Sequence, residues 1–449
     1  MLRRALRIAL LVVSALTVWL VLPASAVPPV GTSATLPIAA GKALSASHPV
    51  LTFTGQMHNP APVPMASNPD PTVCAVNCQL WSLTVATKSP FLVSVHNGSD
   101  SIDDGFNLYV YDPAGNQVAS SAGIGSNGQA AVVEPADPGD YTVAVTMTYA
   151  YDVDTSYLGE ARLMTPGSWD QVHCSTPKPC PLLPALKALP PTDVHIDGVP
   201  PVASTPLGFP IPVEGSIGNS CYLDETANTG ATRCLRFTSE VDNVGSGRLQ
   251  LQIPWAAAGG GSPETGFVPG LCTAQQVITY SDGSTRSRDA GLCEFHAAHA
   301  HFHYRNFVEF SLHKVNPDGT TGTPVASSLK ESFCLADDGY FGFGTAGPNG
   351  ARSYVGQPDC NVPSKVAPTG PDVLVTMGLT PGWGDIYTWD TPDQFIDITS
   401  TPDGDYDLVA RANPAGVLQL AGPAKSCATT RIHLTAAAAT VIAKSIPCT

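Results

Sequence analysis

The sequence predicts an all-β protein. Charged residues make up only 13% of its 449 residues, whereas glycine and proline number 41 and 42. Long amphipathic helices need many charged residues on their solvent side, and this chain has few. Short strands joined by Gly, Pro and Asp turns account better for the composition. The length exceeds that of one ordinary core, so we expect two or three domains.

Residues 1–26 are predicted to be a signal peptide. Three arginines within the first seven residues precede an apolar stretch, and Ala24-Ser25-Ala26 forms a small-residue cleavage site. The alternative is a retained membrane anchor, for which the apolar stretch is short. Cleavage would change the net charge from −15 to −18, because it removes three positive charges and no negative ones. We therefore expect a secreted protein with no membrane attachment after cleavage and no nucleic-acid partner.

Residues 27–70 are rich in Pro, Ala and Ser, and we expect a partly ordered lead-in there. From 71 to 165, strand-like runs such as LWSLTVA, FNLYVYDP and DYTVAVTMTY alternate with turn signals. This spacing predicts an antiparallel β-sandwich that serves as an accessory domain. The run FNLYVYDPAGN followed by PGDYTVAV resembles accessory domains of the secreted prepeptidase-C-terminal type.

The second half of the chain again alternates strands and turns. Residues 166–196 are dense in proline and are predicted to be a linker, because proline interrupts ladders and stiffens connections. Residues 197–449 are predicted to form a second, β-sandwich-type domain. Its expected strands include 293–314, 394–399, 405–412 and 429–434.

The chain has 12 cysteines, none of them in the signal peptide. An even number in an exported chain indicates disulfides. The two shortest spacings would also suit zinc. Pairing of sequence neighbours predicts Cys74–Cys78, Cys174–Cys180, Cys221–Cys234, Cys272–Cys293, Cys334–Cys360 and Cys427–Cys448.

Histidines in the segment FHAAHAHFHY predict a metal site. His299, His301 and His303 are spaced by two, so a strand would place all three on one face, roughly 6–7 Å apart at Cα. His296 has the opposite parity. Imidazole binds copper, zinc, nickel and iron, of which copper and zinc are the realistic metals for an exported protein. The alternative is an accidental histidine run on the surface.

The same segment resembles the copper-binding segment of the lysyl oxidase family, whose pattern is a tryptophan-flanked His-x-x-His-x-His-x-His. All four histidines match, and the family's copper ligands correspond to His299, His301 and His303. The flanking tryptophan is replaced by Phe295, and a cysteine of the segment by Ala298.

Two further segments match the family in the same order, so the resemblance covers about residues 200–449. Leu329-Lys330-Glu-Ser-Phe-Cys-Leu resembles Lys-Ala-Ser-Phe-Cys-Leu, and Pro381-Gly-Trp-Gly-Asp-Ile-Tyr387 with QFIDIT resembles the quinone tyrosine segment. The resemblance implies a lysyl tyrosylquinone cofactor formed from Lys330 and Tyr387. Two family cysteines correspond to Trp383 and Asp393, and both are lost together.

The resemblance implies copper-dependent oxidative deamination of primary amines, peptidyl lysine among them, by molecular oxygen, with release of aldehyde, hydrogen peroxide and ammonia. It favours copper over zinc, because zinc is not redox-active. Lys330 would have to react as the neutral amine, which requires a lowered pKa. Asp385 and Asp397 are candidates for the base. The alternatives are a non-catalytic secreted copper-binding protein and a cell-surface adhesion protein, in which Lys330 and Tyr387 would be ordinary structural residues.

Overall fold

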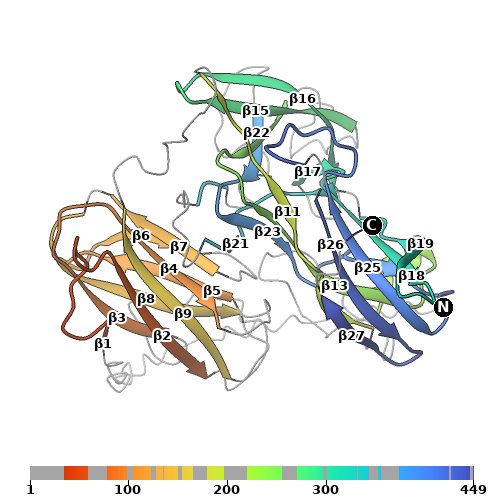
Figure 1. Ribbon diagram of the computed structural model, residues 1–449, viewed down its shortest axis with the longest axis horizontal. Helices are drawn as coiled ribbons and strands as arrows, with labels where there is room; N and C mark the ends of the chain where they lie inside the picture. Colours follow the sequence, from red (N-terminus) through yellow and green to blue (C-terminus); the bar gives the residue numbers. More distant parts are fainter. Residues whose placement is uncertain are drawn as a thin grey trace, which may run out of the picture. The chain divides into compact units, whose positions relative to one another are not determined.

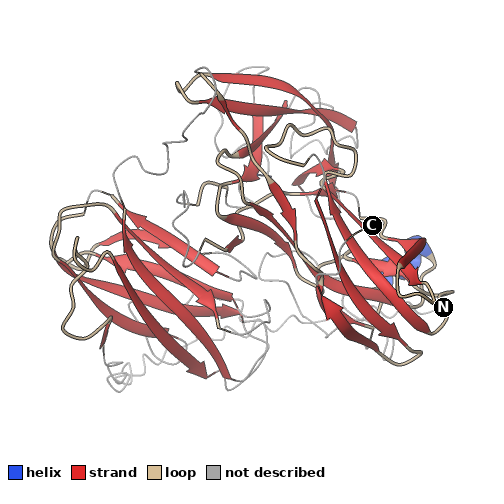
Figure 2. Ribbon diagram, in the orientation of Figure 1, coloured by secondary structure: helices blue, strands red, loops and turns tan. Residues whose placement is uncertain are grey.

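The computed structural model describes residues 35–58, 78–98, 105–122, 128–134, 136–149, 154–164, 179–196, 220–254, 271–296, 301–330, 332–342, 352–354, 360, 374–423, 426–444 and 448. All of them belong to one compact unit, Ser33–Thr449. They form 27 strands and the short helix α1 (Leu223–Thr229), which confirms the all-β prediction (Figure 1 and Figure 2). Among these residues, no helix has the length and apolar character needed to span a bilayer.

Residues 36–163 form two sheets with the strand orders β1-β3-β8-β5-β6 and β2-β9-β4-β7 (Figure 1). Side chains from both sheets, such as Phe53 and Trp81, meet in one apolar core, so this region is a sandwich. Its strands are β1 (Leu36–Pro37), β2 (Val50–His58), β3 (Cys78–Val85), β4 (Phe91–Asn97), β5 (Gly105–Tyr111), β6 (Gln117–Ser121), β7 (Gly128–Val133), β8 (Gly139–Tyr149) and β9 (Asp154–Leu163).

The sandwich begins earlier in the chain than the sequence analysis predicted. Strand β2 lies inside the expected lead-in, 27–70, and pairs with β9 along its whole length. Its residues alternate between exposed and buried, with Leu51, Phe53 and Met57 in the core. This alternation is the pattern that predicts a strand, but the surrounding Pro, Ala and Ser residues obscured it.

Residues 181–444 form three sheets, with β13 at the centre of the one that carries β23 and β24 (Figure 1). The other two have the orders β20-β17-β16-β15-β14-β22 and β19-β18-β25-β26-β27. The strands are β10 (Pro181–Leu182), β11 (Leu186–Ala188), β12 (Thr192–His195), β13 (Cys234–Asn243), β14 (Leu249–Pro254), β15 (Leu271–Tyr280), β16 (Thr285–His296), β17 (His301–Arg305), β18 (Val308–Val315), β19 (Thr321–Ser327), β20 (Ser332–Phe333), β21 (Gly339–Tyr340), β22 (Leu374–Leu379), β23 (Trp383–Tyr387), β24 (Phe395–Asp397), β25 (Gly404–Ala412), β26 (Ser426–Leu434) and β27 (Ala439–Lys444).

The second half of the predicted linker, 166–196, belongs to these sheets. Strand β10 pairs with β15, and β11 and β12 both pair with β13. Pro184, Pro190 and Pro191 lie between the three strands and keep each one short, because proline lacks the N–H that a ladder needs. Residues 166–178 lie outside the described residues.

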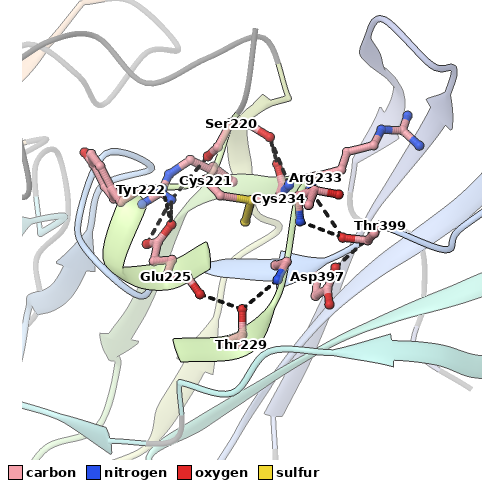
Figure 3. Close-up of a disulfide and its surroundings, with 12 residues drawn as sticks. Ser220, Cys221, Tyr222, Glu225, Thr229, Arg233, Cys234, Asp397 and Thr399 are labelled. Atoms are coloured by element: carbon pink, nitrogen blue, oxygen red, sulfur yellow. Dashed lines mark hydrogen bonds and ion pairs between the residues drawn. A yellow bond between two sulfur atoms is a disulfide. The ribbon is translucent and has the colours of Figure 1, made fainter. Parts of the chain in front are cut away.

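Four predicted disulfides are confirmed: Cys221–Cys234, Cys272–Cys293, Cys334–Cys360 and Cys427–Cys448. Cys78 and Cys180 are also disulfide-bonded, while their expected partners, Cys74 and Cys174, lie outside the described residues. Figure 3 shows how the first of these bonds joins the segment before α1 to the start of β13.

Candidate active site

Two of the three predicted metal ligands lie on one short buried strand. His301 and His303 are two residues apart on β17, and their Nε2 atoms are 2.9 Å from each other. Phe302 between them is buried in the apolar core of this region. His299 lies outside the described residues, as does the side chain of His296, although the backbone of His296 pairs with His301.

A hydrogen bond orients one of the two imidazoles. His303 Nδ1 lies 3.0 Å from the hydroxyl of Ser332 on the neighbouring strand β20. If Nδ1 carries the proton and donates it to this oxygen, the lone pair of Nε2 points toward His301. Metal-bound histidines are commonly fixed through their second nitrogen in this way. The sequence analysis did not single out Ser332.

The spacing of the two nitrogens is compatible with copper. With metal–nitrogen bonds of about 2.0–2.1 Å, two nitrogens 2.9 Å apart would subtend about 90° at a shared ion. An angle of this size is compatible with a copper or zinc ion bound by imidazoles. No cluster of three metal-binding side chains occurs among the described residues, to which His299 does not belong.

The matched lysine and tyrosine lie close together although 57 positions separate them in the chain. Lys330 follows β19 and Tyr387 ends β23, and Lys330 Nζ lies 4.8 Å from the centre of the Tyr387 ring. Phe333 packs against both, at 5.3 Å from Nζ and with its ring centre 5.0 Å from that of Tyr387. The fold therefore brings two of the three matched segments into direct contact.

The Tyr387 hydroxyl is held by the backbone of a single residue. It accepts a hydrogen bond of 2.8 Å from the N–H of Cys334 and donates one of 3.1 Å to the carbonyl of the same residue. Cys334 directly follows β20, the strand that contacts His303. Three consecutive residues, 332–334, therefore connect the histidine segment to the tyrosine segment.

Burial shifts the protonation equilibria of both side chains. Lys330 is 6% exposed, and burial lowers its pKa to about 8, although the carboxylates of Asp393, Asp385 and Glu225 oppose the shift. Burial raises the pKa of Tyr387 well above its ordinary value, and the charges of Asp385 and Asp338 act in the same direction. A neutral amine is therefore accessible just above neutral pH beside a phenol that keeps its proton.

The two candidate bases differ sharply in environment. Asp385 is buried beside the pair and accepts a 2.9 Å hydrogen bond from the N–H of Ala336; burial and the nearby Asp338 raise its pKa well above the ordinary value. Asp397 is exposed at the end of β24 and accepts a hydrogen bond from the N–H of Thr399 in the turn that follows. Of the two candidate bases, only Asp385 is close enough for its charge to affect the pKa of Lys330.

Comparisons with known proteins indicate a distant relationship. No protein-family model matches the sequence. The chain is 33% identical to human lysyl oxidase homolog 1 over 121 residues, 27% of this chain and 17% of the human protein. It is 32% identical to the protein-lysine 6-oxidase of Gallus gallus over 133 residues and 33% identical to that of Sus scrofa over 129 residues, which cover 25% and 42% of those proteins. The matches thus span less than half of each relative.

Two solved structures show only weak similarity to this chain. The pre-peptidase C-terminal domain of a Bacillus anthracis collagenase covers 25% of this chain and is itself covered to 87%, with 19% identity and a TM-score of 0.18. The Bacillus licheniformis lipase BlEst2 in its propeptide form covers 61% of this chain at 11% identity, with 42% of that protein covered and the same TM-score. Values this low support no statement about the fold. The sequence matches alone support a lysyl oxidase-like relationship, over a little more than a quarter of the chain.

Proposed function

We propose that this protein is a copper-dependent amine oxidase of the lysyl oxidase type. The observation that carries the proposal is the contact between Lys330 Nζ and the Tyr387 ring at 4.8 Å, in a buried setting that lowers the pKa of the amine. The similarity to two kinds of lysine oxidase supports the same reaction class. Residues 197–449 would be the catalytic domain, and residues 71–165 with the preceding strand β2 an accessory domain.

His299, His301 and His303 would hold the copper ion. Copper supplies the redox chemistry with oxygen that a tyrosine ring needs in order to become a quinone. The buried pair His301 and His303 offers two nitrogens that already lie 2.9 Å apart, and Ser332 lies within hydrogen-bond distance of one ring. Preorganised ligands reduce the entropic cost of binding the ion.

Lys330 and Tyr387 would form the lysyl tyrosylquinone. A bond forms between Nζ and a ring carbon, while the ring gains an oxygen atom and both partners lose hydrogen; molecular oxygen accepts the electrons and leaves as water and hydrogen peroxide. The amine must be neutral to attack, and its pKa of about 8 leaves an appreciable neutral fraction at mildly alkaline pH. The backbone of Cys334 would hold the phenol oxygen in place during this chemistry.

In turnover, a primary amine, oxygen and water would give an aldehyde, ammonia and hydrogen peroxide. Asp385 would remove the proton from the carbon next to the substrate nitrogen, since it is the buried carboxyl group next to the pair. Burial raises the pKa of Asp385, and a raised pKa makes the ionised carboxylate a stronger base toward that proton. The substrate class includes peptidyl lysine, by analogy with the named activity of the relatives.

An exported location agrees with this function. Four disulfides among the described residues are typical of proteins that fold in an oxidising compartment. We propose that residues 1–26 direct export and that the mature protein acts outside the cell, where oxygen is available.

The test is a comparison of Tyr387→Phe with Tyr406→Phe, a buried tyrosine of strand β25 whose hydroxyl donates to the carbonyl of Pro402. Copper content is measured by metal analysis, the quinone by its colour with phenylhydrazine, and turnover by peroxide release from simple amines and lysine peptides. Tyr387→Phe should bind copper yet give no quinone and no peroxide, while Tyr406→Phe keeps both. A wild-type protein that binds copper without quinone or peroxide is instead a non-catalytic copper protein.

A further inference from the structure

The loop that follows Tyr387 has no covalent support. Residues 388–394 connect β23 to β24, and the chain contains no cysteine between Cys360 and Cys427. Asp393 adopts a left-handed backbone conformation with φ of 64°, which is unfavourable for a residue other than glycine. Other groups must therefore hold this loop in its observed conformation.

A buried ion pair contacts the loop at three backbone positions. Arg236 on β13 donates to the carbonyls of Trp389 at 2.7 Å and Thr391 at 2.6 Å. Glu225 on α1 accepts a 2.8 Å hydrogen bond from the N–H of Asp393. The two side chains also bind each other, with two contacts of 2.7 Å and 3.0 Å.

Neighbouring groups complete the attachment of the loop. The Tyr222 ring lies 4.5 Å below the Arg236 guanidinium, and its hydroxyl donates to the carbonyl of Asp390 at 2.6 Å. The Thr238 hydroxyl accepts a hydrogen bond from the N–H of Trp389. Glu225 also accepts from the N–H of Tyr222, a contact drawn in Figure 3 beside the Cys221–Cys234 disulfide.

Stability alone does not explain this arrangement. Both charged side chains have no exposed surface, and a buried pair commonly gains nothing over apolar residues of similar volume, because desolvation offsets the attraction. What the pair provides is directed hydrogen bonding, because three of its donor and acceptor atoms bind the backbone of one loop. Glu225 and Arg236 also lie close enough to Lys330 to influence the charge of its amine, as does Asp393.

We propose that Glu225 and Arg236 are a positioning pair, which holds loop 388–394 so that Lys330 and Tyr387 keep the contact from which the crosslink forms. This inference rests on the proposed function. Neither residue touches the reacting atoms. The pair acts through the loop backbone, and its loss would misplace the Tyr387 ring, the Asp393 carboxylate or both.

The experiment compares two double variants, each of which replaces an acidic residue by Leu and its arginine partner by Met. Glu225→Leu with Arg236→Met replaces the positioning pair by apolar residues. Asp407→Leu with Arg431→Met does the same to a second ion pair, on β25 and β26, whose contacts of 2.7 Å and 3.0 Å are similar and which does not contact the loop. Arg236→Lys, which keeps the charge but not the two-carbonyl geometry, is the milder variant in case the double variant does not fold.

Three quantities are measured after copper is added to metal-free protein. They are the bound copper, the rate at which the Lys330–Tyr387 crosslinked peptide forms, followed by mass spectrometry, and the pH dependence of that rate. The positioning-pair variant should bind copper normally but crosslink at least tenfold more slowly, with a shifted pH profile. Arg236→Lys should fall between it and wild type, and the control pair should match wild type. Crosslinking at the wild-type rate in both positioning-pair variants would overturn the inference.

A second readout separates this inference from the proposed function. Amide hydrogen exchange of residues 388–395 in metal-free protein should rise at least tenfold in the positioning-pair variant and remain unchanged in the control pair. If wild-type protein forms no crosslink, the proposed function fails, yet the exchange rates still decide whether the pair holds the loop. Unchanged exchange in the positioning-pair variant would show that it does not.

Discussion

The two regions of the described chain bury different kinds of polar group. In the sandwich of residues 36–163, the buried polar side chains are almost all neutral; Glu160, which binds Arg162, is the exception among the described residues there. In residues 181–444, many ionisable side chains are buried. They are Glu225, Arg236, Glu240, Asp242, His301, His303, Lys330, Asp337, Asp385 and Asp407.

We propose that this difference separates a region organised for stability from one organised for chemistry. Burying a charged group costs free energy unless hydrogen bonds or partners compensate, so a sheet protein has no structural reason to bury many. Titratable groups with shifted pKa values gather where a reaction needs them. In the second region several of them surround Lys330 and Tyr387, whereas the first region has no comparable cluster among its described residues.

The largest expected effect comes from removing the buried amine. Lys330→Met should reduce amine oxidation to background and, in metal-free protein at pH 7, raise the free energy of unfolding by about 1–3 kcal/mol, because the folded state no longer has to bury a protonated lysine. The folded pKa of about 8 lies below the unfolded value of about 10.4, so the penalty is full below pH 8 and disappears as the pH rises to about 10.4. Urea unfolding at several pH values measures it.

Lys314 provides the control for that variant. Its Nζ also lies over a tyrosine ring, that of Tyr406 at 5.1 Å, but Lys314 is exposed. Lys314→Met should leave activity unchanged and alter the unfolding free energy by no more than about 0.5 kcal/mol. If both lysines respond alike, burial does not distinguish them and the comparison of the two regions loses its physical basis.

The next largest effect concerns the two candidate bases. Asp385→Asn should lower kcat/KM by about 10²–10⁴-fold, normalised to the quinone that phenylhydrazine titrates, because an amide cannot accept the proton. Asp397→Asn should change kcat/KM less than twofold, since this residue is exposed at the end of β24. A larger loss in the Asp397 variant than in the Asp385 variant would reverse the assignment.

A sandwich variant should show the opposite profile, with stability lost and activity kept. The buried Tyr157 hydroxyl accepts a hydrogen bond from Trp81 Nε1 at 2.7 Å and donates one to Gln79 at 2.7 Å. Tyr157→Phe leaves the indole N–H without this partner and should cost about 1–3 kcal/mol. Thermal unfolding measures the loss, and peroxide release per quinone should stay within twofold of wild type; a parallel loss of activity would contradict the separation of roles.

The smallest effect is a gain in stability. Burial and the neighbouring Glu240 raise the pKa of Asp242 well above its ordinary value, so the folded state favours the protonated acid and loses stability as the pH rises above the unfolded pKa. Asp242→Asn should match wild type near pH 3 and be more stable by about 1 kcal/mol at pH 7. Burial raises the pKa of Asp337 as well, yet Asp337→Asn should destabilise. One carboxylate oxygen accepts from the N–H of Thr380 and the other from the N–H of Ser353, and an amide nitrogen cannot replace either of them.

Sequence reasoning found the elements that depend on local pattern. Alternation located the strands, and the pairing of neighbouring cysteines predicted the four disulfides in which both cysteines are described. The spacing of His301 and His303 predicted that they share a strand face, where the structure brings their nitrogens together. The assignment of copper to these residues and of the quinone to Lys330 and Tyr387 stays a prediction.

What the sequence did not reveal depends on contacts between distant segments. Arg236 lies on a strand in which all ten residues are buried, so its alternation gave no sign that one face carries charges. Its partner Glu225 is on a seven-residue helix, and the loop they hold begins more than 150 positions later. Short strands such as β10, β11 and β12 exist because their partners do, since proline-rich segments have little strand propensity of their own.

The backbone of Cys334, which holds the Tyr387 hydroxyl, belongs to a residue whose side chain is bonded to Cys360. Anyone producing this protein should therefore choose the host by its redox state. In a reducing cytoplasm the Cys334–Cys360 disulfide would not form before metal is supplied. Copper added later would then meet a Tyr387 ring that is less firmly positioned. The protein should therefore be folded under oxidising conditions first, and copper should be added afterwards.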